Sequence, residues 1–150
     1  MLSDFFQKYN TTMTAKFIDT INMSVMVFLI GATGYSIIEY IFRGYTHWSM
    51  ALTGGACLLA FYYYAKANRQ TATMIKAAVG ACIFTVFEFF VGLVVNVWFG
   101  WHVWDYSAQP GNLIGQICPM FSFIWFLICL TILLVYENLH LIYSAFHHGV

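Results

Sequence analysis

The chain has 150 residues, of which 61% are hydrophobic, 20% aromatic and only 8% charged, and its formal net charge is zero. Soluble domains carry about 25% charged residues, so this composition excludes an ordinary soluble domain and favours transmembrane helices. A chain without net charge also has no basic field that would attract nucleic acid.

Residues 1–20 are polar and lack the short apolar core and cleavage site of a signal peptide, so we expect a cytoplasmic N-terminal segment there. Four apolar runs follow, at residues 21–42, 48–64, 74–98 and 114–135. The second run is short and contains a Gly-Gly pair, which favours a tilted or broken helix. The sequence therefore predicts an all-α, polytopic integral membrane protein, with four transmembrane helices in a single transmembrane domain.

Residues 136–150 form the last segment, in which apolar residues recur at three- and four-residue spacing. This C-terminal helical extension could lie along the inner membrane surface or simply continue the fourth span.

The basic residues predict the orientation of the spans. Arg43 lies alone on one side of the bilayer, and the others lie on the opposite side: Lys8, Lys16, Lys66, Arg69 and Lys76. Basic residues are enriched in cytoplasmic loops, so we expect a multi-pass protein of the cell membrane with both termini cytoplasmic.

Two segments, residues 31–39 and 80–88, share one pattern of residue types. Each begins with Gly-Ala, ends with glutamate, and carries an aromatic residue followed by a hydroxyl residue between them. The offset is constant, because 80 − 31 and 88 − 39 both equal 49. The first and third spans run in the same direction, so the pattern predicts an internal repeat of two parallel-related helix pairs.

Each repeat ends in a carboxylate, Glu39 or Glu88, and such a group in or near hydrocarbon costs about 2.5 kcal/mol or more, which makes it a functional candidate. The face of the third span that carries Glu88 should pack inward, because small residues allow helices to approach closely. Its members lie four residues apart: Gly80, Phe84, Glu88, Gly92 and Asn96. Glu88 could be a protonated group that joins helices or a carboxylate that binds a proton or substrate, and no basic residue that could neutralise it lies nearby in the sequence. Glu39 has Arg43 four residues later, which suits an ion pair on one helix face.

The outer segment, residues 101–115, combines interfacial aromatic residues with polar and turn-forming ones. Its candidate site residues are Trp104, Asp105, Tyr106 and Asn112. Asp, Asn, Pro and Gly build tight turns, but a short re-entrant segment directed toward Glu88 would use the same residues. His102 is isolated, and the cysteines lack the paired spacing of metal ligands, so we predict no metal or cofactor site.

The sequence also resembles the ABC-transporter type IV permease family, also labelled CmpB-like. The segments that carry the resemblance are Phe87-Glu88-Phe89-Phe90-Val91-Gly92, Val103-Trp104-Asp105-Tyr106-Ser107, Pro110, Asn112-Leu113, Gly115-Gln116-Ile117-Cys118 and Phe121-Ser122…Trp125. Two departures stand out: Gln116 replaces a basic residue of the family pattern, and Pro119 should kink the fourth span early.

The resemblance implies a transport-related membrane permease subunit that moves a small solute or ion, with Glu88 as the proton- or substrate-binding carboxylate. The other candidate site residues are Glu39, Asp105, Tyr106, Asn112, Asn96, Trp104 and Arg43. Four short spans are too few to enclose a pathway, so we expect a homodimer in the lipid bilayer. No nucleotide-binding motif is present, so any ATP would be used by a separate ATPase subunit or a larger membrane complex.

Two alternatives stay open. The chain could be a membrane-embedded enzyme that acts on a lipid or lipid-linked group, with Glu88 and Asp105 as acid and base and His102 assisting. It could also be a non-catalytic accessory subunit whose buried acids specify helix pairing.

Overall fold

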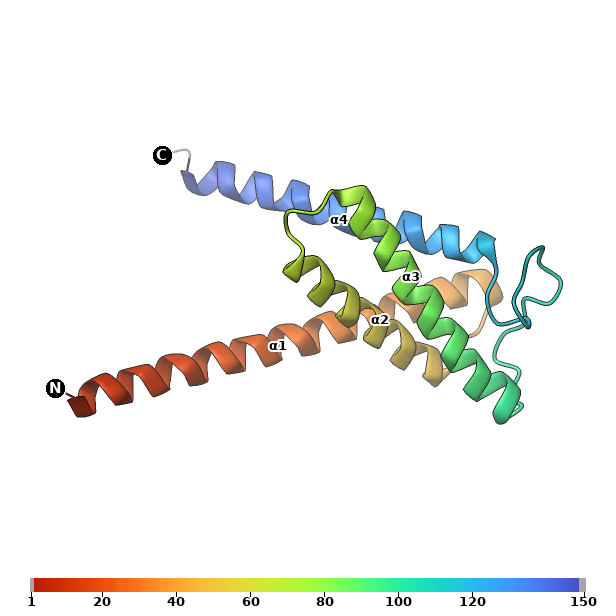
Figure 1. Ribbon diagram of the computed structural model, residues 1–150, viewed down its shortest axis with the longest axis horizontal. Coiled ribbons are helices and arrows are strands. Elements are labelled where there is room, and N and C mark those ends of the chain that lie inside the picture. The colour runs from red at the N-terminus through yellow and green to blue at the C-terminus, as the bar shows by residue number, and fades with distance from the viewer. Residues whose placement is uncertain (1, 149–150) are drawn as a thin grey trace. The chain divides into compact units, whose positions relative to one another are not determined.

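The computed structural model describes the backbone of residues 2–148 and the side chains of residues 12–139. Within residues 2–148, four α-helices follow one another (Figure 1): α1 (Leu2–Arg43), α2 (Trp48–Ala67), α3 (Thr73–Gly92) and α4 (Pro119–His148). A π-helical turn, η1 (Leu93–Trp98), continues α3 directly. Residues 2–148 contain no β-strand, so the predicted all-α fold is confirmed.

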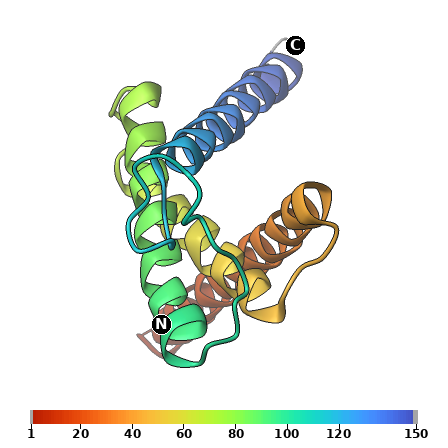
Figure 2. The same cartoon turned by 90° about the vertical axis from the view of Figure 1, so that its right-hand side faces the viewer.

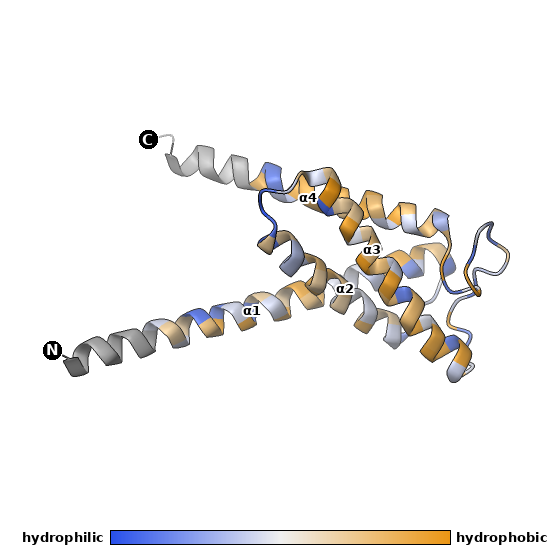
Figure 3. Cartoon of the chain, in the orientation of Figure 1, coloured by the Kyte–Doolittle hydropathy of each residue, from blue (hydrophilic) through white to orange (hydrophobic). Residues whose placement is uncertain are grey.

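Among the residues that the structure describes, three helical stretches are long and apolar enough to cross a membrane: Thr12–Arg43, Thr73–Trp98 and Pro119–Leu139. Figure 3 shows how apolar residues dominate α3 and the described part of α4. The chain is therefore an α-helical membrane protein. α2 is not among these three stretches, since Ser49, Thr53 and a run of three tyrosines dilute its apolar residues. That α2 crosses the bilayer stays a prediction.

The predicted boundary of the fourth span was wrong. Helix α4 begins at Pro119, five residues later than expected, because the preceding residues form a turn in which the Leu113 N–H donates to the Ile117 carbonyl oxygen at 2.9 Å. Ile114 and Gly115 in this turn have φ values of 53° and 68°, which no helix accommodates. Pro119 begins α4 instead of kinking it, since a proline at the first helical position loses no helical hydrogen bond.

The first helix begins earlier than the expected span of residues 21–42, because α1 is already helical from Leu2 onward. At the other end of the chain, the α4 backbone is helical without interruption past residue 136, as a continuation of the fourth span would be. The C-terminal histidine side chains that form part of the predicted extension lie outside the described residues.

The chain consists of two compact units, Met1–Leu59 and Ala60–Val150. In the first unit, glycines allow α1 and α2 to approach closely. A Cβ atom added to Gly31 would lie 2.5 Å from the Gly54 carbonyl oxygen, and one added to Gly55 would lie 2.7 Å from the Phe28 ring. The Gly-Gly pair therefore does not break α2, as we had considered, but packs an unbroken helix against its neighbour.

In the second unit, α3 packs antiparallel against α4. Residues with increasing sequence numbers on α3 contact residues with decreasing sequence numbers on α4. The contacts run in order from Lys76 with Glu137, through Gly80 with Cys129 and Phe84 with Trp125, to Thr85 with Ser122. The segment between the two helices, drawn in teal in Figure 2, is fixed to the end of α3 by the polar contacts described next.

Candidate functional site

The face of α3 that carries Glu88 is buried, as predicted from its small residues. Its members Gly80, Phe84, Glu88, Gly92 and Asn96 are all buried. Glu88 is the least exposed of its polar residues, at 2%. The inward packing of this face is therefore confirmed.

Contacts on both sides along the helix enclose Glu88. One turn earlier, the Phe84 ring stacks on Trp125 with centroids 4.7 Å apart, and Thr85 donates to the Ser122 hydroxyl at 3.0 Å. One turn later comes Gly92, where an added Cβ would meet Gln116 and Trp104. The carboxyl group thus lies at the level of close helix packing inside a candidate membrane span.

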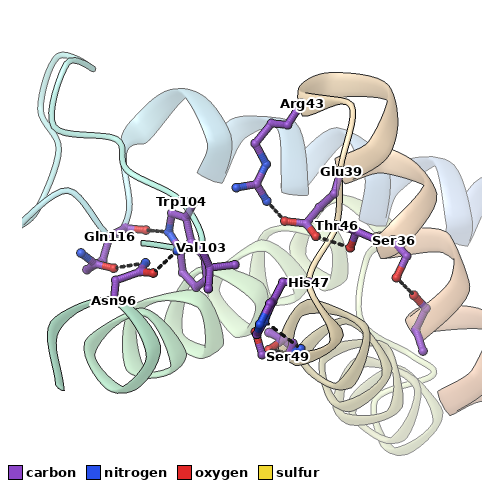
Figure 4. A network of polar contacts seen from close by, with 12 residues as sticks. Ser36, Glu39, Arg43, Thr46, His47, Ser49, Asn96, Val103, Trp104 and Gln116 are labelled. Atoms are coloured by element: carbon purple, nitrogen blue, oxygen red, sulfur yellow. Dashed lines mark hydrogen bonds and ion pairs between the residues drawn. The ribbon is translucent and has the colours of Figure 1, made fainter. Parts of the chain in front are cut away.

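The π-helical turn begins directly after Gly92 and carries the next buried polar side chain of this face, Asn96. π-Helical turns are rare and often occur at functional sites. Asn96 in this turn donates to Gln116 Oε1 at 2.9 Å, while its own Oδ1 accepts from the Val103 N–H at 2.7 Å (Figure 4). Trp104 Nε1 donates to the Gln116 carbonyl oxygen at 2.9 Å. The structure thus brings two predicted site residues, Asn96 and Trp104, together around Gln116.

Gln116 was not among the predicted site residues, because the sequence marked it only as the loss of a basic residue. It is 6% exposed, and its Nε2 donates to the Ile114 carbonyl oxygen at 2.9 Å. The sequence did contain a signal that could have identified Gln116 as a site residue. It is an amide side chain in a stretch without charged residues, and it follows a glycine that permits a turn.

Asp105 is exposed, and its carboxylate stabilises a turn. The Ser107 hydroxyl and the Ser107 backbone N–H both donate to Oδ1, the latter at 2.8 Å. These hydrogen bonds, with a smaller contribution from the charge of His102, lower the pKa of Asp105 below its ordinary value of 3.8.

Asn112 and Tyr106 belong to the same segment. Asn112 Nδ2 donates to the carbonyl oxygens of Ser107 and Gln109 at 3.0 and 2.8 Å, and the Tyr106 ring stacks on Phe121 with centroids 4.5 Å apart. The turn chemistry that the sequence suggested is therefore present. These turns do not exclude a re-entrant segment. The turns concern the hydrogen bonds within the segment, whereas a re-entrant course concerns its depth in the membrane.

In the first unit, Glu39 is 5% exposed and forms the predicted ion pair with Arg43. Its second carboxylate oxygen accepts from the Thr46 hydroxyl at 2.6 Å, as Figure 4 shows. Glu39 thus ties the end of α1 to the turn that precedes α2. Its charge is compensated locally by the arginine.

The described residues contain no cluster of three or more His, Cys, Asp or Glu side chains that could hold a metal ion. The fold and the buried residues define a multi-pass α-helical membrane protein with a carboxyl group enclosed in a helix pair. The chain belongs to the family described as "Putative ABC-transporter type IV", whose pattern matches residues 49–148, two thirds of the sequence. No curated protein and no solved structure matches the chain.

Proposed function

We propose that this chain is a permease subunit that moves a small solute or ion, and that Glu88 is its proton- or substrate-binding carboxyl group. The observation that supports this proposal is the 2% exposure of Glu88 within a candidate membrane span. An intramembrane carboxyl group is costly when charged and bare, and it becomes tolerable when it holds a proton, a cation or a polar substrate group. The membership in an ABC-transporter-related family agrees with transport as the general role.

Glu88 is a better candidate than Glu39 for a group that exchanges its ligand. Glu39 lies four residues before the end of its candidate span, and its contacts with Arg43 and Thr46 are those of a structural ion pair that joins α1 to the following turn. The path outward from Glu88 would pass Asn96 and Trp104, and then Asp105, Tyr106 and Asn112. Glu39 and Arg43 stay predictions as residues of an outer vestibule.

An enzyme that pairs Glu88 with Asp105 as acid and base is less well supported. Asp105 is exposed, and two hydrogen bonds from Ser107 occupy one of its oxygens, whereas Glu88 is buried. Both groups would have to reach the same substrate, and one lies in the exposed turn whereas the other is buried against the helix pair.

The proposed assembly is a homodimer. If transport uses ATP, a separate ATPase subunit of a larger complex supplies the ATPase activity. The three candidate spans found among the described residues are few for a solute pathway, and a second copy doubles them. A second copy could use the face of α1 opposite Gly31, where Met26 and Leu29 are 49% and 57% exposed. The family supports association with an ATPase or another membrane protein.

Reconstitution into proteoliposomes tests the proposal without knowledge of the substrate. A pH-sensitive dye inside the vesicles reports proton flux after an external pH step, and dicyclohexylcarbodiimide labels protonated carboxyl groups that are shielded from water. We expect the intact protein to show flux and labelling at Glu88, and Glu88→Gln to lose both while it elutes as the same oligomer. Glu137→Gln is the matched control, since its amide oxygen can still accept from Lys76 and Thr73.

Flux and pH dependence that are unchanged in Glu88→Gln would reject the role of Glu88. An intact protein that shows no flux, together with a Glu88→Gln variant of lowered stability, would instead favour the accessory-subunit alternative.

A further inference from the structure

The outer segment presents two large apolar side chains at its tip, Leu113 and Ile114, which are 50% and 64% exposed. Ile114 has a φ of 53°, which is a true outlier for a β-branched residue and is energetically unfavourable. Such a conformation persists only when its surroundings enforce it. Gln116 does so here, because its backbone N–H donates to the Leu113 carbonyl oxygen at 3.0 Å and its side chain donates to the Ile114 carbonyl oxygen.

This tip returns to the level of the membrane span. The candidate span that contains α3 ends at Trp98, yet Gln116 lies against Gly92 and bonds Asn96. Gly92 is six residues before Trp98, so the whole of η1 lies between them. The chain therefore leaves the span at Trp98 and comes back to a depth inside it before α4 begins.

The backbone of the tip is suited to such a depth. Irregular backbone within the membrane is tolerated only where its polar groups are bonded to protein or face a wet cavity. The N–H groups of Leu113, Gly115 and Gln116 donate to Ile117 O, Asn112 Oδ1 and Leu113 O, respectively, and Ile114 O accepts from the Gln116 side chain.

The composition around the tip fits lipid as its surroundings. No Asp, Glu, Lys, Arg or His occurs between Tyr106 and Tyr136. Apolar side chains are also exposed at the ends of the flanking helices: Trp98 at the end of η1 is 81% exposed and Met120 at the start of α4 is 50% exposed. We propose that Leu113 and Ile114 form the tip of a shallow re-entrant loop and lie among the lipid acyl chains of the outer leaflet.

Single spin labels on the full chain test this proposal. The labels would be placed at Leu113→Cys and Ile114→Cys, in a background in which the four native cysteines are replaced, and the protein reconstituted into phosphatidylcholine vesicles. Collision with oxygen, which dissolves in acyl chains, is compared with collision with a water-soluble nickel chelate. Ala108→Cys, an exposed position of the same segment, is the matched aqueous control, and Trp98→Cys is the lipid reference.

We expect the Leu113 and Ile114 labels to collide at least several-fold more with oxygen than with the nickel reagent, as at Trp98, and the Ala108 label to show the reverse. The Leu113 position keeps the test decisive if a label at Ile114 alters the strained turn. Nickel access at Leu113 equal to that at Ala108 would overturn the proposal, because the tip would then lie in water. Protection of Leu113 from both reagents would also overturn it, since protein would then cover the tip. Neither result bears on Glu88.

Discussion

Replacing Gly31 with alanine tests the helix contact in the first unit against a control only three residues away. At Gly31 the new Cβ would lie 2.5 Å from the Gly54 carbonyl oxygen and 2.7 Å from Leu58 Cβ. Neither atom can rotate away, because one belongs to the backbone and the other is attached directly to it. At Gly34 an added Cβ meets nothing within 4 Å.

The two substitutions share the same gain in helix propensity, about 1 kcal/mol for alanine over glycine. Overpacking costs about 1–3 kcal/mol, and a clash with backbone belongs near the upper end of that range. We therefore expect Gly31→Ala to be net destabilised by about 1–2 kcal/mol and Gly34→Ala to be stabilised by up to about 1 kcal/mol. For a chain of this size, that difference of about 1–3 kcal/mol separates the two melting temperatures by roughly 2–12 °C.

Thermal unfolding in detergent micelles, followed by near-ultraviolet circular dichroism, measures this difference. The near-ultraviolet signal is needed because it reports packing, whereas isolated helices persist in micelles. Equal melting temperatures for Gly31→Ala and Gly34→Ala would show that α1 and α2 do not approach as closely as the structure has it.

Two further predictions concern the outer segment. Asn96→Leu should lower stability by about 1–3 kcal/mol, because the Val103 N–H and Gln116 Oε1 lose their partner; faster amide hydrogen exchange at Val103 checks it, and unchanged exchange would contradict it. The lowered pKa of Asp105 means that its carboxylate stabilises the folded segment above about pH 3.8, and that this contribution is lost as the pH falls further. Ser107→Ala should therefore raise the pKa of Asp105 toward its ordinary value, as measured by an NMR titration, and an unchanged pKa would refute the assigned cause.

The inward face of α3 could be predicted from sequence because its signal is periodic and local. Residues four apart lie on one side of a helix, and a stripe of glycine, glutamate and asparagine has no reason to face lipid. The ion pair of Glu39 with Arg43 was equally predictable, since its spacing lies within one helix.

The start of α4 and the role of Gln116 depend on contacts between distant residues, which no local pattern reports. The apolar run from residue 114 suits a helix by composition alone. The structure instead uses residues 113–118 in a turn whose hydrogen bonds reach back to Asn96 and Trp104. Tertiary contacts outweigh hydropathy there, and the positive φ of Ile114 shows that they also outweigh local conformational preference.

The two matching segments differ at the position one helical turn after their glutamates. Residues 31, 35 and 39 are buried in the first, and residues 80, 84 and 88 are buried in the second. Adding 49 to Arg43, however, gives Gly92. The first segment thus places a cation one turn after its glutamate, whereas the second places a glycine there.

Gly92 leaves room for the neutral amide of Gln116, at a position where the family pattern that the chain resembles has a basic residue. The two segments therefore use the position one turn after the glutamate differently: in the first an arginine pairs with Glu39, and in the second a glycine lets the Gln116 side chain pack against α3.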